Sequence, residues 1–237
     1  SALNALSATQ VGVLTSAQLG ALGSDQLQAL GSTTLRSLTS TQLAALGTDD
    51  LNQLTADQFQ SLSTAQIAAL TTLQVSALMS DDLRALGTAQ IRALETADLA
   101  GLSTENLAAM GTAQVTALTS SQIAALHSDQ LQALTTTQLA ALGSAQLAAL
   151  TSDDLNTLSA AQLAALSTSR LAALTSGQIN AMGTDDLLAL TTAQVRGLTT
   201  SQLAAMDTET LNVLSTAQFA ALSSGQLSAL TSHQVAS

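Results

Sequence analysis

The chain lacks proline, cysteine, tryptophan and tyrosine, and it has only two phenylalanines, Phe59 and Phe219. The absence of cysteine suits the cytosol and cysteine-poor bacterial secreted proteins equally. Lysine is absent too, so five arginines face sixteen acidic residues and the formal net charge is −11. Phosphate contacts need clustered basic side chains, so we expect no nucleic-acid binding, and an anionic membrane surface would repel this chain.

Long hydrophobic runs are also missing. Hydrophobic residues make up 46% of the sequence, but they are mostly leucine and alanine spread evenly along it. No run approaches the roughly 18 apolar residues that span a bilayer, so no membrane insertion is expected. Disordered segments are poor in large aliphatic residues, and the abundance of leucine therefore favours an ordered fold.

An eight-residue repeat runs through the whole sequence. From Ser7 the same plan returns in 28 complete octads, without one insertion. With octad positions numbered 1 to 8, position 2 is nearly always Ser or Thr, and position 4 is mostly Gln or Asp. Position 5 is Leu, Ile, Val or Phe, position 7 is usually Ala, and position 8 is Leu or Met. Internal repeats of this kind are typical of stacked architectures.

The period of eight excludes a continuous helix and a strand. On one long helix the leucine stripe would wind around the axis, and on a strand positions 5 and 8 would face opposite sides. On a short helix, however, positions 5 and 8 share a face. Ser or Thr at position 1 or 2 predicts an N-cap, and Gln or Asp at position 4 resembles the second half of a capping box. Glycine is expected just past a helix C-terminus, and it occupies position 1 of seven octads: Gly23, Gly31, Gly47, Gly87, Gly111, Gly143 and Gly183.

The sequence thus predicts an all-α solenoid with one short capped helix per octad. Acidic octads recur every three or four units, and the pattern closes after 104 residues, as when GTDDLNQL at 47 returns as TSDDLNTL at 151. Thirteen octads in four turns gives roughly three (about 3.25) helices per coil. We expect a leucine-filled core with Ser, Thr and Gln outside. Residues 1–237 form one continuous solenoid in this prediction, with an internal duplication of 23–126 in 127–230.

Paired acids are the clearest candidate for chemistry. Asp49–Asp50 and Asp81–Asp82 either bind Ca²⁺ through carboxylate oxygens or are charges that suit the positive end of a helix. His127 and His233 have no second histidine at ligand spacing, so we expect both to be exposed corner residues. No Ser/His/Asp arrangement can be argued from them. The sequence therefore assigns no catalytic, cofactor-binding or metal-binding residue and predicts no enzymatic activity.

The motif LTxxQLxAL appears as LTSTQLAAL, LSTAQIAAL, LTSSQIAAL and LTTTQLAAL. It resembles octapeptide arrays of very large bacterial secreted or surface proteins, some labelled as adhesins or haem-utilisation proteins. The resemblance covers the whole chain and implies an extracellular stalk, spacer or filament. Two scattered histidines do not favour haem binding here.

We expect a structural protein: an extracellular fibre, stalk or adhesin segment at a bacterial cell surface. Neither end of the array is a distinct polar capping octad, which predicts stacking end to end with other copies or continuation in a longer array. The alternative is a binding module that uses the side of the solenoid for Ca²⁺ or another ligand. Ice binding through ranks of Thr and Ser is a weaker form of that alternative.

Overall fold

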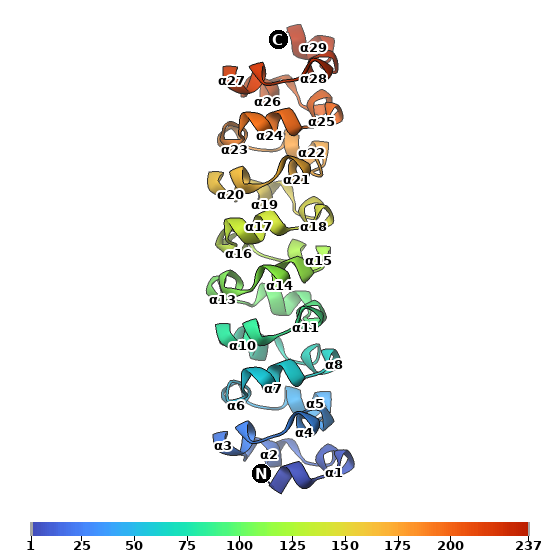
Figure 1. Cartoon of the computed structure of the whole chain (residues 1–237), viewed down its shortest axis with the longest axis vertical. Coiled ribbons are helices and arrows are strands. Elements are labelled where there is room, and N and C mark those ends of the chain that lie inside the picture. The colour runs from blue at the N-terminus through green and yellow to red at the C-terminus, as the bar shows by residue number, and fades with distance from the viewer. Residues whose placement is uncertain (1, 237) are drawn as a thin grey trace. The chain divides into compact units, whose positions relative to one another are not determined.

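The structure is a computed structural model that describes residues 2–236, and these residues form two compact units. The first unit spans residues 1–125 and the second spans 126–237. Over the described residues both consist of short helices joined by tight corners, without a β-strand (Figure 1).

The first unit contains one 3₁₀ turn and fifteen α-helices: η1 (Ala2–Ala5), α1 (Ala8–Gly12), α2 (Ser16–Gly20), α3 (Ser24–Gln28), α4 (Ser32–Ser37), α5 (Ser40–Ala44), α6 (Thr48–Leu51), α7 (Ala56–Ser61), α8 (Thr64–Ile67), α9 (Thr72–Ser76), α10 (Ser80–Ala85), α11 (Thr88–Ala93), α12 (Thr96–Ala100), α13 (Thr104–Ala109), α14 (Thr112–Ala117) and α15 (Ser120–Ala124). The second unit contains α16 (Ser128–Ala133), α17 (Thr136–Ala141), α18 (Ser144–Ala148), α19 (Ser152–Asn156), α20 (Ala160–Ala165), α21 (Thr168–Leu171), α22 (Ser176–Asn180), α23 (Thr184–Ala189), α24 (Thr192–Gly197), α25 (Thr200–Ala205), α26 (Thr208–Asn212), α27 (Thr216–Ala220), α28 (Ser224–Ser228) and α29 (Ser232–Ala236).

Each helix begins at octad position 2, and position 1 is its N-cap. Thr39 is typical: its backbone is extended, with φ −68° and ψ 156°, and its hydroxyl accepts a hydrogen bond from the Gln42 N–H. The helix ends within the same octad, and the position-8 N–H donates to the position-5 carbonyl, as Leu46 does to Leu43 at 3.1 Å. The predicted caps and the unit of one helix and one corner are therefore confirmed.

Glycine at position 1 has a different role from the one expected. Gly143 has φ −72° and ψ 160°, so it is an extended N-cap. No described residue has a positive φ, so none adopts the left-handed conformation of a glycine C-cap. The expectation was wrong because the corner is made by two extended residues, position 8 and the next position 1, which leaves no room for a left-handed turn.

Within each unit, a helix packs on the helix three places further on. In the first unit α4 packs on α7, α7 on α10 and α10 on α13; in the second, α17 packs on α20 and α20 on α23. The position-5 side chains inside these stacks are fully buried, as Leu83 and Leu163 are at 0% exposure, and the position-8 side chains are almost as buried. The predicted all-α solenoid with a leucine-filled core is confirmed.

One position-7 glycine lies against a neighbouring coil. A Cβ placed on Gly197 would lie 2.6 Å from the Cβ and 3.3 Å from the Cα of Thr168. Gly197→Ala should therefore cost about 1–3 kcal/mol of unfolding free energy, although alanine is the usual residue at this position. Gly225→Ala is the control because no atom lies within 4 Å of its Cβ. It should leave stability unchanged or raise it by up to about 1 kcal/mol in urea unfolding. Equal effects of the two variants would contradict the packing of α24 against α21.

Candidate functional site

The glutamine at position 4 holds the coils together. In the first unit, Gln66 Oε1 accepts from the Ser63 N–H at 2.9 Å, which completes the capping box of its own helix. Its Nε2 donates to the carbonyls of Leu35 at 2.8 Å and Leu38 at 2.9 Å, which lie four octads earlier. One side chain thus binds three backbone groups: the Ser63 N–H and the Leu38 carbonyl, which the short helices leave without partners, and the Leu35 carbonyl, which also accepts from the Leu38 N–H at 3.1 Å. We refer to this arrangement as a glutamine bridge.

Glutamine bridges recur in both units with the same spacing, since Nε2 reaches the carbonyls 31 and 28 residues earlier, as it does in Gln66. They are made by Gln42, Gln58, Gln66, Gln74, Gln90, Gln114 and Gln122 in the first unit and by Gln162, Gln178, Gln194, Gln202, Gln218, Gln226 and Gln234 in the second. Helices pack three places apart and bridges reach four octads back. A coil therefore holds more than three octads and fewer than four, in agreement with about 3.25.

The bridging glutamines are buried, which corrects the expectation that Gln lies outside with Ser and Thr. Gln66 is 3% exposed and Gln202 is 2% exposed. The reason is physical: both ends of the amide find backbone partners, so burial leaves no polar atom unsatisfied.

Asparagine at position 6 replaces the bridge in some octads. Asn156 Oδ1 accepts from the Gly183 N–H at 3.1 Å, and its Nδ2 donates to the Ala181 carbonyl at 3.0 Å. A position-4 glutamine would normally accept from this position-1 N–H. Here the asparagine, which lies four octads earlier, accepts from it instead. In every such case within the described residues, the position 4 that follows four octads later is not glutamine; the pairs are Asn4 with Thr34, Asn52 with Asp82, Asn156 with Asp186, and Asn180 with Thr210.

Asp82 takes the place of a bridging glutamine but carries no hydrogen to donate. Its side chain is 6% exposed, and Oδ2 accepts from the Met79 N–H at 3.3 Å. Asn52 Oδ1 is the counterpart of the Asn156 Oδ1 that accepts from Gly183, but it is buried and has no hydrogen-bond partner. Burial raises the pKa of Asp82, the Met79 N–H opposes this, and the charge of Asp81 adds to the increase. Burial likewise raises the pKa of Asp186, against the Gly183 N–H and with the charge of Asp185.

Replacing Asp82 by asparagine should stabilise the protein at neutral pH. Asn106 occupies the same octad position, and its Nδ2 donates to the Leu78 carbonyl at 2.8 Å. A new donor at residue 82 should add on the order of 1 kcal/mol. Because the folded-state pKa of Asp82 is raised, the wild type recovers stability as pH falls through that pKa. The gap between Asp82→Asn and wild type in urea unfolding should therefore narrow toward acidic pH, and a gap independent of pH would contradict this account.

The other candidate residues do not come together as a site. Asp49 and Asp81 are exposed at position 3, whereas Asp50 and Asp82 lie at position 4, where Gln normally bridges. No group of three or more His, Cys, Asp or Glu side chains suited to a metal ion occurs among residues 2–236. His127 and His233 are exposed, as expected.

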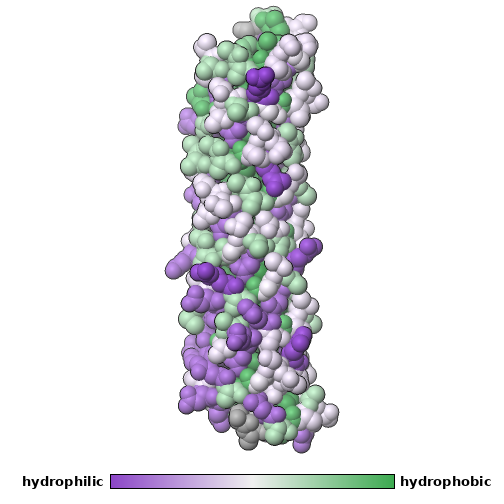
Figure 2. All heavy atoms as spheres, viewed as in Figure 1, coloured by the Kyte–Doolittle hydropathy of each residue, from purple (hydrophilic) through white to green (hydrophobic). Residues whose placement is uncertain are grey.

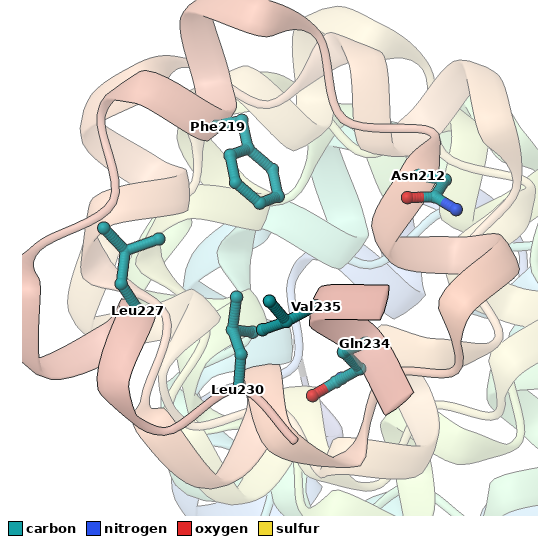
Figure 3. A pocket seen from close by; sticks show the side chains of 6 residues that line it. All are labelled: Asn212, Phe219, Leu227, Leu230, Gln234 and Val235. Carbon is teal, nitrogen blue, oxygen red and sulfur yellow. The ribbon is translucent and has the colours of Figure 1, made fainter. Parts of the chain in front are cut away.

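The carboxy-terminal face of the second unit is apolar and open. It surrounds a cavity of about 440 Å³ lined by Asn212, Phe219, Leu227, Leu230, Gln234 and Val235. Figure 3 shows these side chains around one space, contributed by the last helices of the chain. The position-5 residues of three consecutive octads are exposed here: Phe219 by 39%, Leu227 by 43% and Val235 by 70%. Hydrophobic residues also reach the surface at this end of the second unit in Figure 2.

Short capped helices that stack through buried leucines and glutamine bridges define an α-helical repeat protein of the solenoid class. The ALTTAQ repeat family matches the chain in seven segments, residues 20–56, 44–80, 93–128, 123–156, 152–184, 179–215 and 204–237. The chain belongs to the ALTTAQ repeat family, and a tandem repeat is therefore confirmed. A comparison with curated proteins found no match.

The family and the fold indicate a structural repeat protein, and an all-helical array of this kind fits a protein without enzymatic activity. Across the part of the chain that the structure describes, no helix has the length and apolar character needed to cross a membrane.

Proposed function

We propose that the chain is a structural spacer, an extracellular fibre, stalk or adhesin segment of a bacterial cell surface. The observation that carries this proposal is that the buried glutamine amides bind the protein's own backbone. The bridging glutamines use both ends of their amides on backbone groups, so the recurring side chains build the scaffold itself. The prediction of one continuous solenoid with a 104-residue duplication remains a prediction, and it suits a spacer because identical units lengthen an array without new kinds of contact.

The proposal also includes association of copies through the carboxy-terminal face. Exposed position-5 side chains there would become buried against another coil, and burial of apolar surface stabilises by about 25 cal/mol per Å². Sedimentation velocity tests this directly: the sedimentation coefficient should rise with protein concentration. Leu227→Asp combined with Val235→Asp should abolish the increase. A wild-type protein that stays monomeric at high concentration and physiological salt would refute the association.

The extracellular location is tested separately. Antibodies against the chain should label intact, unpermeabilised cells of the source organism, and external protease should remove the signal. Labelling that requires permeabilised cells would refute a surface location and leave the scaffold function to be tested inside the cell.

A further inference from the structure

The amino-terminal coil carries glutamine bridges that are only half made. Gln10, Gln18 and Gln26 cap their own helices, with Oε1 accepting from the N–H of Ser7 at 2.9 Å in the first case. Their Nε2 groups have no acceptor among the described residues, since bridge acceptors precede the glutamine by 31 and 28 residues. All three side chains are exposed, whereas bridging glutamines such as Gln66 are buried.

The carboxy-terminal face offers the missing acceptors. In the bridge of Gln66 the two acceptors precede the glutamine by 31 and 28 residues. With that spacing, the carbonyls of Phe219 and Leu222 would serve one further bridge, and those of Leu227 and Leu230 the next. No glutamine of the described chain reaches these four carbonyls. The face therefore presents bridge acceptors beside its exposed apolar side chains, and the amino-terminal coil presents bridge donors.

The asparagine pairing gives an independent check of this match. Asn212 occupies position 6 on the carboxy-terminal face, and every other position-6 asparagine is followed, four octads later, by a position 4 without glutamine. The octad frame can be continued beyond residue 237 into a second copy of the chain. The octad of that copy with Ala2 at position 4 then lies four octads after the octad of Asn212, which is the spacing of the other asparagine pairs. The next three octads carry Gln10, Gln18 and Gln26 opposite Ala220, Ser228 and Ala236. Only the first of these positions carries an asparagine, and there Ala2 satisfies the rule.

We infer that the carboxy-terminal face binds the amino-terminal coil of a second copy, with Gln10 donating to the Phe219 and Leu222 carbonyls and Gln18 to the Leu227 and Leu230 carbonyls. This inference rests on the proposed association and gives its partner, polarity and register. The contact is heterologous, so each complex keeps one free face of each kind and can add further copies.

Complementation between two blocked variants tests this contact. The first variant, Gln10→Glu with Gln18→Glu, keeps the oxygen that caps each helix and loses the Nε2 donors. The second, Leu227→Asp with Val235→Asp, blocks the carboxy-terminal face. Each variant alone should associate at least about tenfold more weakly than wild type, which corresponds to about 1.4 kcal/mol. An equimolar mixture should form a 1:1 heterodimer by sedimentation velocity, because each variant retains the face that the other has lost.

The matched control is Gln60→Glu with Gln132→Glu, which adds the same charge at exposed position-6 side chains and should associate like wild type. Dimers of the first variant alone would show a contact between two carboxy-terminal faces, and a monomeric mixture would exclude the head-to-tail contact; either result overturns the inference. If wild type itself never associates, the proposed association fails as well. Circular dichroism melting checks that each variant folds, and Leu227→Ser is the milder block if the double aspartate variant does not.

Discussion

Replacing Gln66 by leucine should destabilise the protein by about 2–6 kcal/mol, because two backbone groups would be left without a partner at about 1–3 kcal/mol each. Leucine has a similar size but leaves the Ser63 N–H and the Leu38 carbonyl without a hydrogen bond, and the Leu35 carbonyl keeps only its bond from the Leu38 N–H at 3.1 Å. Urea unfolding followed by circular dichroism measures the loss.

Gln60→Leu provides the matched control, because Gln60 is exposed at position 6 of the preceding octad and no hydrogen bond of its side chain enters the bridge. Its effect should stay within about 0.5 kcal/mol. A second variant, Gln66→Glu, separates the two ends of the amide: it keeps the capping oxygen and removes only the two donated hydrogen bonds. If both leucine variants had the same small effect, the glutamine bridge would not be a source of stability.

Phe59→Ala should cost about 3–5 kcal/mol of unfolding free energy. Phe59 is 0% exposed at position 5 of α7, in the stack formed by α4, α7 and α10. The cavity left by the ring is held open on both sides by neighbouring coils, so relaxation should be limited. In an array stabilised mainly by contacts between neighbouring repeats, this cavity should also broaden the urea transition.

The other phenylalanine is the internal control. Phe219 occupies the same octad position in α27 but is 39% exposed at the carboxy-terminal face. Phe219→Ala should cost only about 1 kcal/mol, because part of the ring already contacts water. Equal losses for the two variants would mean that the stacks do not bury position 5 as described.

Much of the fold follows from local sequence signals. Leucine at positions 5 and 8 specifies one buried face of a short helix, and the Thr39-type cap with Gln42 fixes where each helix begins. These signals act within one octad, so a period of eight is sufficient to reveal them. The number of octads per coil was predicted from the spacing of the acidic octads, which recur every three or four units.

The glutamine bridge was missed because its second half joins octads that lie four places apart in the sequence. A signal for it was nevertheless present: a capping box accepts Glu as readily as Gln, yet no octad has Glu at position 4. Exclusion of Glu indicates that the NH₂ group is used as a donor. The link between Asn52 and Asp82, or Asn156 and Asp186, is a second signal that needs the coil geometry before its meaning is clear.

The carboxy-terminal face was predicted only as a property of an uncapped array. Its particular residues could not be identified, because Phe219, Leu227 and Val235 have the same octad position as fully buried residues such as Leu83. Their exposure depends on which coils stack next to them, and that is a property of the assembled fold.

The most direct test of the account is the hydrogen exchange of glutamine side-chain amides, measured by NMR on protein labelled with ¹⁵N at glutamine. Bridging amides such as Gln66 and Gln202 should exchange slowly, because Nε2 is buried and donates to two carbonyls. The exposed amides of Gln10, Gln18, Gln60 and Gln132 should exchange rapidly in dilute, monomeric protein. Equal rates for the two groups would contradict the claim that glutamine bridges join the coils.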